Sequence, residues 1–154
     1  MRKFVPFLSA CLLGACVSGP AWPDGASKVD RKAMADVDGE AALTAELASK
    51  IWNWAEVGYQ EEKSSALLQE TLKEEGFTVE ADVAGIPTAF VASYGTGGPV
   101  IAILAEFDAL PGINQAATPD REERPGMSAG HACGHNLFGA GSVSAAIAIR
   151  RWLE

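Results

Sequence analysis

Apolar residues recur with helical spacing through the first half of the chain. From about position 38 they occur at i, i+4, i+8, i+11 and i+12, which is one face of a helix formed by Leu43, Leu47, Ile51, Trp54 and Ala55. Gly58 and Tyr59 interrupt the pattern, and a second helix is expected from 61 to 75. Its expected core face comprises Ala66, Leu68 and Leu72, with Leu67 beside them. Gly76 follows, where a helix C-terminus favours glycine.

Three strands are expected next. Residues 77–83 alternate apolar and polar side chains, which is typical of a half-buried strand. Residues 88–94 and 100–105 predict two more, joined by a glycine-rich turn at 95–99. This turn lacks the Gly-Lys-Ser/Thr ending of a phosphate-binding loop. Because residues 100–105 are almost wholly apolar, we expect an interior strand that is covered on both faces.

A long polar loop and an apolar helix complete the pattern. Residues 106–127 contain three prolines, and loops of this length in a compact domain are usually functional. Asn136 is a good N-cap for a helix that runs to the end of the chain. Since this helix is apolar nearly all round, we expect it to be buried on both sides. The order helix, helix, strand, strand, strand, helix predicts an α/β layered domain.

The N-terminus has the features of a processing signal. Arg2 and Lys3 form a charged head, residues 4–13 form a short apolar core, and small residues precede Cys16. The pattern resembles a bacterial lipoprotein signal over residues 1–15, after which Cys16 would carry the lipid. It predicts export to the periplasm or outer membrane, with membrane attachment through that lipid. An ordinary secretory signal and a buried N-terminal segment are the alternatives.

The signal divides the chain into three parts. Residues 17–28 are rich in Gly, Pro and Ser, so we expect a flexible tether at 16–38, followed by the domain at 39–154. With Cys11 removed and Cys16 acylated, Cys133 would be the single free thiol.

Composition narrows the class of protein. A chain of 154 residues that is 48% hydrophobic and 21% charged fits one soluble globular domain. Twelve Lys and Arg against twenty Asp and Glu, a net charge of −8, argue against a nucleic-acid partner, because phosphate binding needs a basic face. No apolar run reaches the roughly 18–20 residues that a membrane-spanning helix needs.

Two groups of residues carry candidate chemistry. Glu106 and Asp108 follow the apolar strand at i and i+2, at the end of the strand where α/β sheets bind ligands. The alternative interpretation is that Glu106 and Asp108 are a solvated pair of loop acids. The second group is His131, Cys133 and His135, which combine the usual zinc donors with flanking glycines. The alternatives are a buried, inert cysteine with two loop histidines, or a cysteine–histidine nucleophile pair. This set alone provides only part of a metal site.

Four motifs together resemble the zinc-dependent aminoacylase and carboxypeptidase family (peptidase family M-twenty). The likeness covers residues 43–154 approximately and is strongest with the amidohydrolase branch that includes p-aminobenzoyl-glutamate hydrolase and related dipeptidases. The motifs lie at 51–61, 85–90, 105–112 and 131–136, the last reading His-Ala-Cys-Gly-His-Asn. The resemblance implies the N-terminal part of a layered metallopeptidase catalytic domain, with helices packed on a mixed sheet.

The resemblance also implies roles for single residues. Cys133 and His135 would bind metal, with two divalent ions in the complete domain: zinc, or manganese or cobalt in its place. Asp108 matches the catalytic-site acid that supports the metals. Asn136 stands where many relatives have aspartate, in agreement with the p-aminobenzoyl-glutamate hydrolase branch. Glu106 stands where other branches have a histidine ligand or an aspartate, so its role stays open.

The implied reaction is hydrolysis of an amide that joins an acyl, aryl or aminoacyl group to an amino acid. The implied partners are an N-acyl amino acid or dipeptide substrate and, at full length, a second copy of the chain. In the family the catalytic glutamate and the other ligands follow the histidine motif, whereas this sequence ends at Glu154. An inactive lipoprotein fragment and a cysteine hydrolase that uses Cys133 with His131 or His135 are the alternatives.

Overall fold

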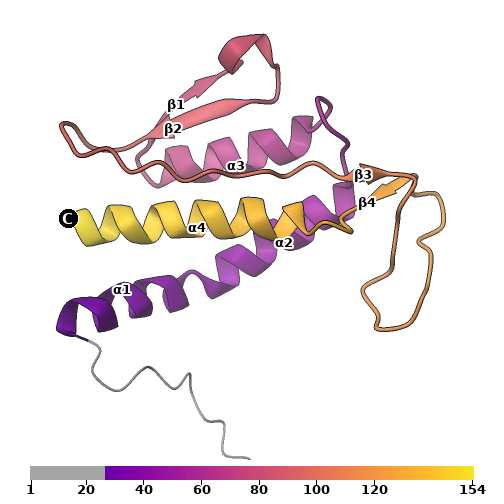
Figure 1. The fold of residues 1–154 in the computed structure, drawn as a ribbon, viewed down its shortest axis with the longest axis horizontal. Coiled ribbons are helices and arrows are strands. Elements are labelled where there is room, and N and C mark those ends of the chain that lie inside the picture. Colours follow the sequence, from indigo (N-terminus) through magenta and orange to yellow (C-terminus); the bar gives the residue numbers. More distant parts are fainter. Residues whose placement is uncertain (1–26) are drawn as a thin grey trace, which may run out of the picture.

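The structure, a computed structural model, describes residues 27–154. The predicted signal at 1–15 and the lipid site at Cys16 lie outside the described residues. The helices are α1 (Lys28–Gly39), α2 (Ala41–Trp54), α3 (Glu62–Glu74), the 3-10 turn η1 (Val83–Gly85) and α4 (His135–Leu153). The strands are β1 (Thr78–Ala81), β2 (Phe90–Ser93), β3 (Leu110–Pro111) and β4 (Ala129–Gly130). Figure 1 shows α4 running lengthwise through the middle of the molecule, with α1 and α2 along one side and α3 with the β1–β2 hairpin along the other.

The main core lies where α2, α3 and α4 meet. Leu47 and Ile51 from α2, Leu68 from α3 and Ile147 from α4 are completely buried there. The predicted helices and the core face of the first are confirmed. In α3, however, Ala66 is exposed and two serines are buried.

Hydrogen bonds explain why polar residues replace Ala66 inside the core. The backbone N and hydroxyl of Ser64 both donate to the Glu56 carboxylate, and the Ser65 hydroxyl donates to the carbonyl of Thr88. A buried hydroxyl costs little once it is hydrogen-bonded, so α3 can turn this polar edge inward. The expected core face was wrong at Ala66 because apolar spacing does not show such partners.

The strands form two small antiparallel sheets. β1 pairs with β2 from Thr78 opposite Ser93 to Ala81 opposite Phe90, and β3 pairs with β4. The combination of helices and strands fits the predicted α/β class, and the first two expected strands are confirmed in shorter form. Within residues 27–154 there is no mixed sheet: both sheets are two-stranded, and parallel pairing is limited to one bridge between Val57 and Ala109.

The expected interior strand at 100–105 is the main correction. These residues form no strand and are exposed, Val100 at 85% and Leu104 at 79%. Figure 1 shows the segment running lengthwise beside α4, from the end of β2 to β3. An interior strand needs a partner at each edge and a layer on each face. The described residues supply α4 on one side, and β1 and β2 pair with each other.

The predicted tether is also wrong over residues 28–38, which form most of α1. Ser27 caps this helix: its hydroxyl accepts a hydrogen bond from Asp30 N, while the Asp30 carboxylate accepts one from Ser27 N. This reciprocal capping box stabilises the first turn of a helix that lies against α4. The Gly, Pro and Ser content that suggested a tether lies mainly before it.

α4 begins one residue earlier than expected and is buried on one side only. Gly134 is its N-cap, in the left-handed conformation at φ 82°, so the prediction that Asn136 caps the helix was wrong. Asn136 is buried instead, and its amide donates to the carbonyl of Ala48. Leu137 and Phe138 are exposed, whereas the opposite side packs into the core. No helix in residues 27–154 has the length and apolar character to cross a membrane.

Candidate functional site

The segment that carries the two candidate acids is fixed at both ends. Ala109 N donates to the carbonyl of Glu56 at 2.7 Å, beside the parallel bridge to Val57. At the other end the chain passes close over α4 at Gly139, where an added Cβ would lie 3.0 Å from the carbonyl oxygen of Glu106. Because glycine permits this close approach, the segment reaches the first turn of α4.

One histidine lies between the two acids. His135 Nδ1 is 2.7 Å from an oxygen of Asp108, and His135 Nε2 is 3.0 Å from an oxygen of Glu106. The histidine side chain is 18% exposed, that of Asp108 is 32% exposed and that of Glu106 is 59% exposed. Both acids lie on the same side of the extended chain, as their i, i+2 spacing predicts. The imidazole is therefore oriented through both of its nitrogens.

Among the described residues, Cys133 makes no hydrogen bond or ion pair with this cluster. Its thiol is free and exposed, on a turn closed by a hydrogen bond from Gly134 N to the carbonyl of His131. Within residues 27–154, no hydrogen bond joins Cys133 to either histidine, which leaves the cysteine–histidine nucleophile without support. The structure thus brings together Asp108, Glu106 and His135, but does not add the thiol.

His131 anchors the same turn to α2. It is 6% exposed, its Nε2 lies 3.1 Å from the carbonyl oxygen of Ile51, and its ring stacks on Trp52 with centroids 6.3 Å apart. Burial lowers the pKa of His131, because the charged imidazolium loses hydration; the hydrogen bond with Ile51 opposes this shift. Its Nδ1 has no hydrogen-bond partner. We interpret His131 as a residue that holds the Cys133 turn in place.

The residues fit a divalent metal in donor type but not in number. Imidazole, thiolate and carboxylate are all zinc donors, and the contact with Asp108 would leave His135 Nε2 as the coordinating atom. Among residues 27–154, however, no group of three or more His, Cys, Asp and Glu side chains is arranged to hold a metal ion. What is present is a partial site, one oriented histidine with a thiol nearby in sequence.

Sequence reasoning left two contacts of this site unassigned. The i, i+2 spacing predicted that Glu106 and Asp108 lie on one side of the chain. It did not predict that His135 is the residue they contact. The bond of His131 to Ile51 had no sequence signal, because it joins residues 80 positions apart.

Comparison with known proteins identifies the family. No protein-family model matches the chain. It is 41% identical to a subunit of p-aminobenzoyl-glutamate hydrolase of Escherichia coli (strain K12) over 133 residues, which is 85% of this chain and 25% of that protein. The chain belongs to the M20 amidohydrolase family. The predicted resemblance is thus confirmed.

Two other members of the family show how far the match extends. Identity to the mouse (Mus musculus) Xaa-Arg dipeptidase is 31% over 158 residues, 92% of this chain and 33% of that protein. Identity to thermostable carboxypeptidase 1 of Saccharolobus solfataricus is 34% over 93 residues, 59% of this chain and 23% of that protein. This M20 chain therefore spans about a quarter to a third of the length of these relatives.

Proposed function

We propose that the chain forms part of a metal-dependent amidohydrolase that cleaves the amide between an acyl, aryl or aminoacyl group and an amino acid. The observation that carries this proposal is the orientation of His135 by Asp108 and Glu106, in a chain similar to amide and peptide hydrolases. Candidate substrates are p-aminobenzoyl-glutamate and dipeptides, after the names of the relatives.

In this proposal His135 and Cys133 bind the metal. The bound metal would lower the pKa of a coordinated water and polarise the scissile carbonyl. Asp108 fixes the ring through Nδ1, which leaves Nε2 directed toward the Glu106 carboxylate. Binding of a metal at Nε2 requires Glu106 to give up its contact with that nitrogen.

Metal binding by the 154-residue chain tests the ligand assignment directly. Because this chain supplies only part of a ligand set, we expect titration calorimetry to show weak zinc binding that is abolished in His135→Ala and Cys133→Ser. In Asp108→Asn we expect a loss of about 10–100-fold, because the acid acts through the imidazole. The matched control is Asp120→Asn, an exposed loop acid outside the cluster. Equal binding by wild type and His135→Ala contradicts the assignment.

A chimera tests the reaction. The 133 matched residues of the E. coli relative are replaced by the corresponding residues of this chain, and release of p-aminobenzoate from p-aminobenzoyl-glutamate is measured. We expect hydrolysis that a chelator stops and zinc, manganese or cobalt restores, with a loss of at least about 100-fold in His135→Ala. A folded, metal-loaded chimera that is inactive beside an active parent contradicts the proposed function.

We also propose that the chain is exported and anchored through a lipid on Cys16. The support is the sequence Leu13-Gly14-Ala15-Cys16 after a charged head and an apolar core. Labelling of the expressed chain with a fatty acid, lost in Cys16→Ser and retained in Cys11→Ser, is the expected result. The proposal is contradicted if the wild type, like the variants, takes up no labelled fatty acid.

A further inference from the structure

A groove with no residue in common with the His135 cluster runs along the exposed side of α3. Its volume is about 570 Å³, which is in the range of small-ligand sites. One wall is α3, and the other is formed by the turn before α3 and the turn before β2. We call it the α3 groove, and its lining includes Tyr59, Glu62, Glu70, Lys73, Pro87 and Thr88.

Buried hydrogen bonds hold the two walls of the α3 groove together. The hydroxyl of Ser65 donates to the carbonyl of Thr88 at 2.7 Å and accepts a bond from the Gln69 amide at 2.9 Å. The hydroxyl of Thr88 in turn donates to the Glu61 carboxylate at 2.6 Å. Because Ser65, Thr88 and Glu61 are all buried, these bonds fix the walls relative to each other. A site that is already formed loses less entropy when it binds a ligand.

Beside this groove lies a buried carboxylate without a cation. Glu61 is 8% exposed, and within residues 27–154 no lysine, arginine or histidine forms an ion pair with it. Its carboxylate also receives no bond from the N-terminus of α3, because the amides of Lys63 and Ser64 donate to Glu56. A buried carboxylate is costly unless a cation compensates it, so this end of the groove favours a positive ligand.

The rim of the groove adds to the negative charge. Glu62 and Glu70 are exposed, and neither carboxylate forms an ion pair within the part of the chain that the structure describes. Lys73 is the one cation among the lining residues, and it follows Glu62 by eleven positions, about 16 Å along the helix. The ammonium of Lys73 therefore leaves the Glu62 end of the groove negative.

Tyr59 places an aromatic ring at this negative end. It is 73% exposed, and its backbone is left-handed at φ 67°, which is rare for a residue other than glycine. Its hydroxyl has no hydrogen-bond partner among residues 27–154. An exposed ring on a strained backbone adds little to the core, and such strain is concentrated at binding sites. An aromatic face beside carboxylates is the combination that binds an organic cation.

We propose that the α3 groove binds a peptide through an arginine or lysine side chain. The charged group lies between the ring of Tyr59 and the carboxylates of Glu61 and Glu62, and the apolar part of the side chain lies along Pro87. The rest of the groove, toward Gln69, has room for the adjoining peptide backbone. This site requires neither a metal nor catalysis, so its failure is distinguishable from failure of the proposed function.

NMR titration of the 154-residue chain tests the site. The probe is acetyl-Gly-Arg-Gly-amide, which is blocked at both ends so that its guanidinium is the only charge. We expect saturable chemical-shift changes in the amides of residues 59–73 and 87–88. The matched probe has citrulline in place of arginine, which keeps the shape and removes the charge. It should bind at least about tenfold more weakly, because hydrogen bonds to a charged group are the stronger ones.

Variants at the negative end identify the contacts. Tyr59→Ala should weaken binding by about twofold or more through loss of the cation–π contact. Its unfolding midpoint should stay unchanged, because the ring is exposed. Tyr59→Phe keeps the ring and should bind as the wild type does. Glu62→Gln should also weaken binding, whereas the matched control Glu80→Gln, an exposed acid on β1 outside the groove, should not.

Three results would overturn the proposal. If the citrulline peptide binds as tightly as the arginine peptide, the groove does not recognise the cation. If neither peptide gives a saturable shift, or the shifts lie outside residues 59–73 and 87–88, the α3 groove is not the site. If Tyr59→Ala lowers the unfolding midpoint, Glu62→Gln decides the matter, and binding equal to that of the wild type then rejects the site.

Discussion

At the scale of single residues, the candidate site is the imidazole of His135, which two carboxylates orient. Their segment passes close over α4 at Gly139. His135 opens α4, and its two carboxylate partners come from the extended segment. The crossing depends on Gly139, since an added Cβ would lie 3.0 Å from the Glu106 carbonyl and 3.1 Å from Phe107 Cβ. Any side chain at Gly139 therefore pushes the acids away from the histidine.

Substitution of Gly139 by alanine should destabilise the chain. Both contacts are closer than a normal Cβ contact, and one is with backbone that cannot rotate away. We expect a loss of about 1–3 kcal/mol in the free energy of unfolding, measured by denaturant titration. Gly141→Ala is the matched control in the same helix, because nothing lies within 4 Å of its added Cβ. There we expect a gain of about 0.5–1 kcal/mol from helix propensity, and equal effects of the two substitutions would contradict the crossing.

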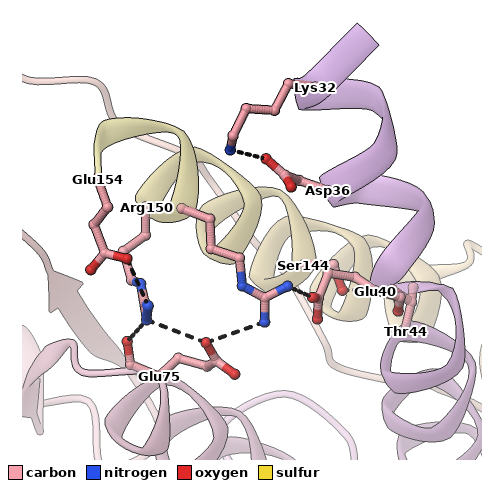
Figure 2. A network of polar contacts seen from close by, with 9 residues as sticks. Lys32, Asp36, Glu40, Thr44, Glu75, Ser144, Arg150 and Glu154 are labelled. Atoms are coloured by element: carbon pink, nitrogen blue, oxygen red, sulfur yellow. Dashed lines mark hydrogen bonds and ion pairs between the residues drawn. The ribbon is translucent and has the colours of Figure 1, made fainter.

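At the scale of elements, hydrogen bonds and ion pairs hold the helix ends together. Figure 2 shows the network where the α1–α2 junction, the end of α3 and the end of α4 meet. Arg151 pairs with Glu40, which is buried between α1 and α2, and also lies 3.5 Å from Glu75. Arg150 donates to the carbonyl of Glu75 at 2.8 Å. Two consecutive arginines thus link three helices to α4.

Removal of Arg151 should lower the free energy of unfolding, because the Glu40 carboxylate loses its cation. In Arg151→Ala, the Glu40 carboxylate stays buried without a cation, and we expect a loss of about 1–3 kcal/mol in denaturant titration. Since the arginine is 36% exposed, the loss should fall below that of a fully buried pair. Adding Glu40→Gln to Arg151→Ala should recover part of it, because an amide costs less to bury than a charge. A purely additive double mutant would show that the two groups are uncoupled.

The N-terminus of α1 should depend on pH through Asp30. The hydrogen bond from Ser27 N, with that from the Ser27 hydroxyl, lowers the pKa of Asp30 below its ordinary value of 3.8. Because the folded-state pKa is the lower one, the cap contributes fully above pH 3.8 and is lost as pH falls through the folded-state pKa. We expect the Cα chemical shifts of residues 28–31 to move toward coil values as the pH falls below 3.8. Asp30→Asn should show no such titration, and a wild-type titration centred above 3.8 would contradict the cap.

At the scale of the whole molecule, local patterns predicted well and long-range pairings did not. The helical spacing of Leu43, Leu47 and Ile51 depends only on the helix itself, and that helix is confirmed. The i, i+2 spacing of Glu106 and Asp108 likewise placed both acids on one side. Burial of residues 100–105, in contrast, depends on partner strands far away in sequence, and no local pattern reports whether they are present. The capping residues Ser27 and Asp30 were visible in the sequence and could have revealed α1.

Leu68 and Leu104 show how far burial can differ between two residues of the same type. Leu68 is completely buried between α3 and α4, whereas Leu104 in the extended segment at 100–105 is 79% exposed. Leu68→Ala should cost about 2–5 kcal/mol in the free energy of unfolding, because it leaves a cavity in the only large core of the described residues. Leu104→Ala should change it by less than about 0.5 kcal/mol in the chain alone, since little is lost on truncating an exposed side chain. A large effect at Leu104 would contradict the exposure of this segment in the chain alone.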